Sequence, residues 1–264
     1  MPRHIAHRYS TPRLVRAITI LAAGCAFGQS SDYEQGVAQF QQGNLAGAIP
    51  FLTRAAEANP RDPQMWKALG VVYAARREYA SAEPPLRRAC ELDAKAEDAC
   101  YFHARALYAL DRYDASLRSL DRDGRGIWKV RLARAQALEA MGNADRADKE
   151  FRESVALCRG IDAGPGVAYG LFLVRQGRAA EATAPLEEVL KRFPGSADAH
   201  TYLGRALLES GRLTEAIPHL ERAVALAPAS AQAHLLLAKA YVRSGRAGDA
   251  EGHFELAAKF GEEK

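Results

Sequence analysis

The sequence predicts an all-α protein, an α-solenoid of about seven helix-turn-helix repeats. Three series of residues predict this fold, because each recurs at an interval of about 34 residues. The first series is small: Gly36, Gly70, Ala104, Ala135, Gly170, Gly204 and Ala238. The second series, which follows the first within each repeat, is also small: Ala48, Ala82, Ser116, Ala147, Ala182, Ala216 and Ala250. The third series is large and apolar: Leu52, Leu86, Leu120, Phe151, Leu186, Leu220 and Phe254.

Each series has a physical role in a pair of amphipathic helices. Two helices cross closely only where their side chains are small, and a large apolar residue fills the space beside the crossing. A glycine between the first two series supplies a left-handed turn, at Gly43, Gly142, Gly177, Gly211 and Gly245. Proline ends the second helix of three repeats, at Pro60, Pro194 and Pro228. One such hairpin cannot bury its apolar face alone, so the repeats are expected to stack.

The second repeat shows the pattern most clearly, in the run Met65-Trp66-Lys67-Ala68-Leu69-Gly70-Val71-Val72-Tyr73 followed by Ala82 and Leu86. These residues resemble the tetratricopeptide repeat, whose period is about 34 residues. The resemblance covers residues 29–264 and implies a right-handed superhelix. The expected repeats lie near 29–62, 63–96, 97–127, 128–162, 163–196, 197–230 and 231–264. The third repeat is shortened at residues 121–126, where we expect the stack to be least regular.

The resemblance also implies where a partner binds, because first helices of this family line a concave groove. We expect a protein or peptide segment of unknown identity to contact that groove. The alternative is a self-associating structural array, with the end hairpins stacked on another copy. A chaperone-tail partner is not expected, because Lys67 matches the first position of the family's carboxylate clamp but Val71 occupies the second. The groove positions are Tyr33, Val37, Phe40, Lys67, Val71, Tyr101, Arg105, Tyr108, Leu132, Gln136, Glu139, Arg205 and Lys239, with the aromatic ones in the N-terminal half.

The sequence lacks the motifs of common enzyme classes. The glycines at 124–126 and 164–166 have neither the strand nor the lysine of a phosphate-binding loop, and no Gly-x-Ser-x-Gly motif occurs. His200 and His234 share one repeat position and His219 and His253 another, and we interpret all four as packing and surface residues rather than metal ligands. We therefore expect no catalytic residues, no cofactor and no metal.

Residues 1–28 have the three-part pattern of a secretory signal peptide: four arginines without an acid, an apolar run from Ala17 to Phe27, and small residues before Gln29. Leu21–Cys25 resembles a lipobox with its leucine one place too early, so lipidation of Cys25 and membrane anchoring form an alternative. We expect an exported, periplasmic or envelope-associated protein. The net charge of +4 equals the charge of those four arginines, so residues 29–264 are neutral and nucleic-acid binding is not expected.

Three cysteines lie beyond residue 28. Cys90 ends the second helix of one repeat and Cys100 begins the first helix of the next, so the two are expected to be near each other. We consider either a disulfide between them or two buried thiols. Cys158 lies apart and is expected to be free.

Overall fold

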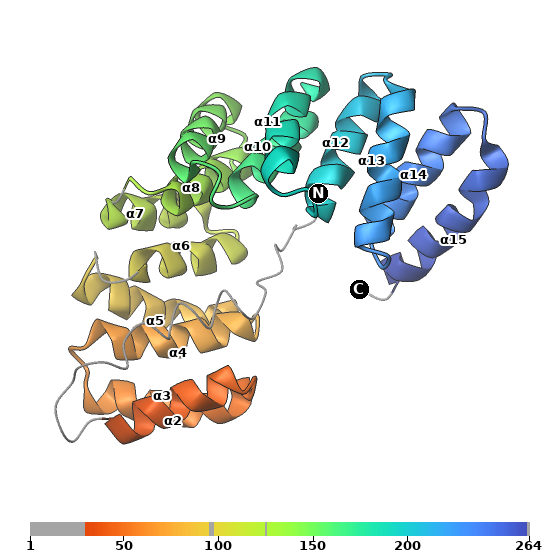
Figure 1. Ribbon diagram of the computed structural model, residues 1–264. Coiled ribbons are helices and arrows are strands. Elements are labelled where there is room, and N and C mark those ends of the chain that lie inside the picture. Colours follow the sequence, from red (N-terminus) through yellow and green to blue (C-terminus); the bar gives the residue numbers. More distant parts are fainter. Residues whose placement is uncertain (1–29, 95–97, 125, 263–264) are drawn as a thin grey trace. The chain divides into compact units, whose positions relative to one another are not determined.

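Fourteen helices form seven hairpins in the described part of the computed structural model, residues 30–94, 98–124 and 126–262, which contains no strand (Figure 1). The chain divides at Gly126 into two compact units, and each is described by itself. The N-terminal unit contains α2 (Ser30–Gln41), α3 (Leu45–Ala58), α4 (Pro63–Ala75), α5 (Tyr79–Leu92), α6 (Ala99–Ala109) and α7 (Tyr113–Asp123). The C-terminal unit contains α8 (Trp128–Ala140), α9 (Ala144–Cys158), α10 (Gly164–Arg175), α11 (Ala179–Arg192), α12 (Ala197–Glu209), α13 (Leu213–Leu226), α14 (Ala231–Arg243) and α15 (Ala247–Glu262). The predicted all-α fold of repeated hairpins is confirmed.

All seven hairpins turn in the same way. In each, the backbone amide directly before the second helix donates to a carbonyl near the end of the first helix, as Asn44 N does to Gln39 O at 2.9 Å. Five turns place glycine at positive φ, as expected. The other two place Arg77 (φ 62°) and Asp111 (φ 58°) at the same point, although non-glycine residues are strained there by about 1 kcal/mol. Tertiary packing therefore imposes this turn even without glycine.

The predicted crossings are present and close. A methyl group built on any of four glycines would contact the leucine of the third series in the same hairpin: Gly36, Gly70, Gly170 and Gly204. The methyl group would lie 2.6 Å from Leu52 Cγ at Gly36 and 2.4 Å from Leu86 Cγ at Gly70. The four leucines are fully buried. Because real side chains do not approach so closely, the glycines are required where these leucines fill the crossing.

The shortened third repeat ends where the two units divide. Its second helix, α7, has 11 residues, whereas the second helices of the other hairpins have 14 to 16. Gly124 ends α7 in the left-handed conformation, with φ 63°. The shortening of the third repeat therefore falls on α7, which is about one helical turn shorter than the other second helices.

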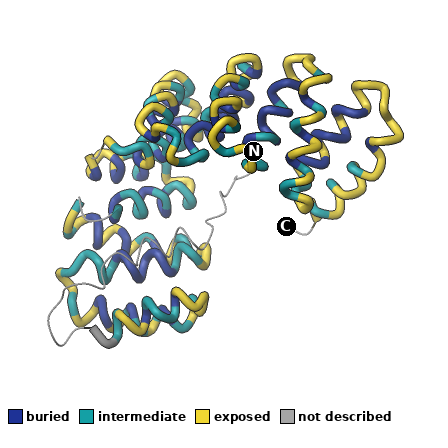
Figure 2. Tube along the Cα trace, in the orientation of Figure 1, coloured by how far each residue is buried: buried dark blue, intermediate teal, exposed yellow. Residues whose placement is uncertain are grey.

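The last hairpin is the most open part of the C-terminal unit. Only Ala250 is buried on α15, whereas α12 is buried over most of its length (Figure 2). Phe254 continues the large apolar series, yet it is 41% exposed, whereas the other six members are 0–1% exposed. No helix in the described residues is both long enough and apolar enough to cross a membrane.

Candidate partner-binding surface

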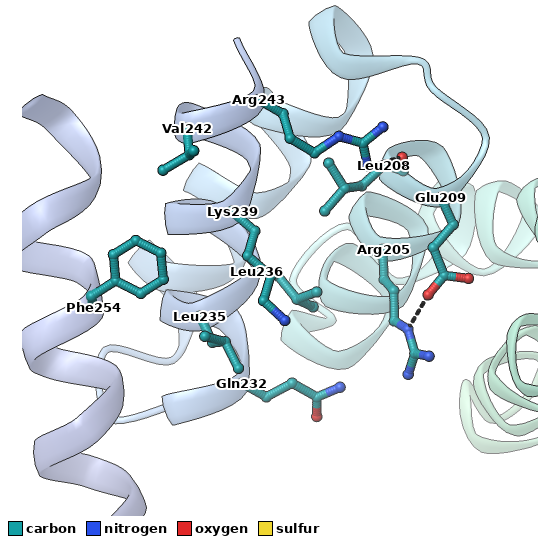
Figure 3. Close-up of a pocket in the computed structure, with 10 residues that line it drawn as sticks. All are labelled: Arg205, Leu208, Glu209, Gln232, Leu235, Leu236, Lys239, Val242, Arg243 and Phe254. Atoms are coloured by element: carbon teal, nitrogen blue, oxygen red, sulfur yellow. Dashed lines mark hydrogen bonds and ion pairs between the residues drawn. The ribbon is translucent and has the colours of Figure 1, made fainter. Parts of the chain in front are cut away.

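A pocket of about 520 Å³ lies in the C-terminal unit, between α12, α14 and α15 (Figure 3). Its apolar side chains include three that are unusually exposed, Leu235 (38%), Val242 (49%) and Phe254 (41%). Phe254 faces α14 from α15 (Figure 3). The pocket is lined by Arg205, Leu208, Glu209, Gln232, Leu235, Leu236, Lys239, Val242, Arg243 and Phe254. Such a mixture of apolar area and a few polar groups is typical of a binding surface.

The charges around this pocket are predominantly positive. Arg205 Nε donates to Glu209 Oε1 at 2.7 Å, so the one carboxylate of the pocket lining is already paired. Arg243 Nη1 donates to the Leu208 carbonyl at 2.8 Å, which holds this guanidinium at the upper edge (Figure 3). Lys239 is exposed beside them. The pocket thus offers two cationic side chains without a carboxylate partner in its own lining.

Two of the predicted groove residues, Arg205 and Lys239, meet in this pocket. The other predicted residues of the C-terminal unit, Leu132, Gln136 and Glu139, are half-buried on α8. Glu139 accepts from Arg175 Nη1 of α10 at 3.1 Å, so it joins two first helices. The resemblance predicted residues of α12 and α14 that line this pocket, but it did not indicate that α15 adds Phe254 to the lining.

In the N-terminal unit, the predicted groove residues differ in how far they are buried. Tyr33, Val37, Tyr101, Arg105 and Tyr108 are half-buried, and the Arg105 guanidinium lies 5.9 Å from the centre of the Tyr108 ring. The assignment of these residues to partner binding stays a prediction.

Three other expected groove residues are buried. Phe40 (4% exposed) and Val71 (0%) belong to the core that α2, α3, α4 and α5 share, so their assignment to a partner surface is wrong: they fill the space between helices. Lys67 is also buried, at 5% exposure.

The histidines of the last two hairpins form two pairs, which the sequence interpretation missed. His200 Nδ1 lies 3.1 Å from His219 Nδ1, and His234 Nδ1 lies 2.8 Å from His253 Nδ1. Each pair joins the first and second helix of one hairpin, whereas the sequence interpretation grouped the four histidines by repeat position. The available signal was the sequence separation, which is the same in both pairs. No group of three or more potential metal ligands occurs in the described ranges.

A third polar cluster lies in the N-terminal unit, around a disulfide between Cys90 of α5 and Cys100 of α6, whose Cα atoms are 4.6 Å apart. Ser119 Oγ of α7 donates to the Cys100 carbonyl at 3.0 Å, and His103 Nδ1 lies 3.0 Å from Ser119 Oγ. Glu83 Oε1 lies 3.4 Å from His103 Nε2. The residue types resemble a hydrolase triad, but Ser119 is buried and its hydrogen is engaged by a carbonyl. The cluster therefore ties three helices together.

The remaining cysteine, Cys158, is free, as expected, and it is also buried. The predicted signal peptide at 1–28 and the lipidation alternative at Cys25 lie outside the described residues.

Family models of the tetratricopeptide repeat match most of the chain. One matches residues 33–97 and 170–231, a second matches 207–260 and a third matches 98–122. No curated protein sequence matches.

Solved structures share the fold. The Cut9 and Hcn1 hetero-tetramer of the APC/C aligns with a TM-score of 0.68 and 16% identity over 86% of this chain, which spans 46% of that one. PilF of Pseudomonas aeruginosa aligns with a TM-score of 0.65 and 18% identity, over 80% of this chain and 97% of its own. YrrB, described as a tetratricopeptide-repeat protein with an unusual peptide-binding site, aligns with a TM-score of 0.51 and 20% identity, over 69% and 95%.

Proposed function

We propose that this chain, which belongs to the tetratricopeptide-repeat family, is a protein-interaction scaffold that holds a partner segment in the pocket between α12, α14 and α15. Repeat arrays of this kind use their extended surfaces to bind other proteins. The observation that carries the proposal is the exposed apolar group of Leu235, Val242 and Phe254 beside cationic side chains.

The pocket favours a segment with an apolar side chain next to a carboxylate. The apolar side chain would cover Leu235 and Phe254, which are too exposed to contribute to the core of the unit. The carboxylate would lie near Lys239 and Arg243, where charge complementarity steers association and selects among partners. Peptide binding by YrrB agrees with this class of ligand, although the likeness to YrrB concerns the fold.

We also propose that the scaffold works in the bacterial envelope. Two observations support this location: the signal-peptide pattern of residues 1–28, and the disulfide between Cys90 and Cys100. Disulfides form and persist in oxidising compartments and are rare in the cytosol. Mass spectrometry of the mature protein from fractionated cells tests the location. A chain that keeps residues 1–28 in the cytosolic fraction contradicts the proposal, and an added lipid mass on Cys25 supports the anchored alternative.

The pocket is tested by selecting peptides from a random display library on the full-length protein. Wild-type protein should enrich peptides that combine an apolar residue with Asp or Glu. Lys239→Glu should weaken their binding about tenfold or more, because a carboxylate would then face a carboxylate. Lys259→Glu, the same charge change on α15 outside the pocket lining, is the matched control. Peptides that bind wild type and Lys239→Glu equally would show that the pocket is not the site.

Self-association is the second candidate function, because the same apolar side chains could pack against another copy. Light scattering of the full-length protein over a range of concentrations separates the two. A protein that stays monomeric at high concentration counts against self-association. A dimer that the Phe254→Asp substitution dissociates would show that a second copy, rather than another partner, covers the pocket.

A further inference from the structure

The two histidine pairs continue into hydrogen bonds with the backbone. His200 Nε2 lies 3.1 Å from the Pro194 carbonyl oxygen, and His234 Nε2 lies 2.9 Å from the Pro228 carbonyl oxygen. Pro194 and Pro228 precede α12 and α14 respectively. The same ring nitrogens and the same proline carbonyl are therefore paired in each of the last two hairpins.

These contacts define the protonation of each ring. A carbonyl oxygen only accepts hydrogen bonds, so Nε2 of His200 and of His234 carries a hydrogen. In a neutral ring the other nitrogen, Nδ1, is then an acceptor. The second-helix histidine, His219 or His253, must therefore donate through its own Nδ1–H. In each of these two hairpins, hydrogen bonds therefore run from the histidine of the second helix to the histidine of the first helix, and from there to a carbonyl of the preceding loop.

The geometry suits a proton better than a metal. The ring centres are 5.3 Å apart in the first pair and 5.1 Å in the second, while the facing nitrogens are 3.1 and 2.8 Å apart. The nitrogens therefore lie between the rings and point at each other, as an N–H···N hydrogen bond requires. Zinc needs about 2 Å to each nitrogen in a tetrahedral arrangement, which facing nitrogens at this separation do not provide.

Charged groups of both signs surround the pairs. Arg222 of α13 lies near His200, while Glu187 of α11 and Glu215 of α13 lie near His219. Burial lowers the pKa of His200, and burial together with the facing ring of His200 lowers the pKa of His219. The neutral pair is therefore the favoured state at neutral pH.

The second pair has similar surroundings. Asp249 of α15 and Glu221 of α13 lie near His253, whose pKa is lowered by burial and by His234. The rings of Tyr241 and Phe260 contact His253 and His234 respectively, with centroids 5.8 and 5.9 Å apart. His234 itself is buried, at 2% exposure.

We propose that each histidine pair is a proton-sensitive clasp that holds the two helices of its hairpin together and, in α14–α15, keeps the pocket in shape. A first proton can enter at Nε2 of His219 or His253 and leaves the N–H···N bond intact. A second proton must enter at Nδ1 of His200 or His234, where donor then faces donor and the bond breaks. His253 precedes Phe254, and α14 carries Leu235 and Lys239, so opening this clasp would alter the pocket. The last step rests on the function proposed above for the pocket.

Hydrogen exchange of the full-length protein tests the clasp without any partner. Between about pH 7.5 and about pH 5, after correction for intrinsic rates, amides of α14 and α15 should exchange about tenfold faster or more relative to those of α2–α4. His219→Asn combined with His253→Asn should abolish this change. An Asn amide can donate to a neutral histidine and can rotate to accept from a protonated one. A pH response that persists in the double variant, or no response in wild type, would overturn the proposal.

A measurement on wild type covers the case in which the variant does not fold. Nitrogen NMR of the histidine rings at about pH 7.5 should show Nε2–H tautomers for two rings, His200 and His234, and Nδ1–H tautomers for their partners. The opposite tautomers would contradict the clasp. Peptide binding by wild type at neutral pH reports on the pocket separately, so the clasp and the scaffold function can fail independently.

Discussion

The α6–α7 hairpin of the N-terminal unit and the α14–α15 hairpin of the C-terminal unit share one plan but are held together differently. Around α6, a disulfide and a Ser–His–Glu chain join α5, α6 and α7, and both cysteines are buried. In α14–α15 a pair of hydrogen-bonded histidines links the two helices of one hairpin, and the neighbouring apolar side chains stay exposed. A covalent bond therefore fixes the junction between two hairpins in one region, whereas a side-chain hydrogen bond links the two helices of one hairpin in the other. The following predictions test this contrast, from the largest expected effect to the smallest.

Loss of the disulfide should affect the N-terminal unit most. Its cysteines are 10 residues apart, and a loop of that size gives a loss of about 3 kcal/mol in the free energy of unfolding. Urea denaturation of wild type with and without a reductant measures it, and Cys90→Ala with Cys100→Ala should reproduce the reduced value.

Cys158→Ala is the control for the disulfide, because this thiol is buried but unbridged. Its response to the reductant should equal that of wild type. If the Cys90→Ala, Cys100→Ala variant still loses stability on reduction, the effect of the reductant does not come from the disulfide between α5 and α6.

A side chain added at a glycine crossing should lower the free energy of unfolding by less than loss of the disulfide does. Gly204→Ala places a methyl group 2.5 Å from Leu220 Cγ, so we expect about 2 kcal/mol of destabilisation from overpacking. Gly252→Ala has no atom within 4 Å on exposed α15 and should stabilise by about 0.5 to 1 kcal/mol through helix propensity. Thermal unfolding of the two variants checks both signs. Equal effects would mean that the α12–α13 crossing tolerates separation.

Acidification should destabilise both regions by a smaller amount. Burial lowers the pKa of His103, and burial also lowers the pKa of His219 and His253. The unfolded chain therefore binds more protons than the folded one, so stability is complete above about pH 6.5 and falls as the pH drops below it. Urea midpoints measured across that range check the sign.

Variants assign the acid effect to the two regions. His103→Asn should flatten the response of the N-terminal unit and leave that of the C-terminal unit unchanged. A stability that rises on acidification would contradict the neutral state assigned to these histidines.

The fold was predictable because the three periodic series report directly on helix crossings. The turns at Arg77 and Asp111 were less visible, since residues other than glycine there occupy the left-handed conformation only under the constraint of packing. An alignment of the repeats gives His200 and His234 the same repeat position. In the structure, however, His200 contacts His219 of its own hairpin.

The binding surface was predicted only in part. A family position says which side of a helix a residue occupies, and it does not say how closely the next helix approaches. Phe40 and Val71 are covered by such an approach, while Phe254 is 41% exposed. Arg205 and Lys239 were predicted from their positions on first helices, and both line the pocket that α12, α14 and α15 form.

The glycine–leucine crossing has a consequence for how such a chain can change over generations. Gly36, Gly70, Gly170 and Gly204 each meet a leucine in the same geometry, so unequal recombination among these four hairpins would exchange or duplicate a whole module with its crossing already matched. The third hairpin differs, because Ser116 Oγ donates to the Ala104 carbonyl at its crossing. A copy of one of the four glycine hairpins placed there would bring its own glycine–leucine crossing in place of this hydrogen bond.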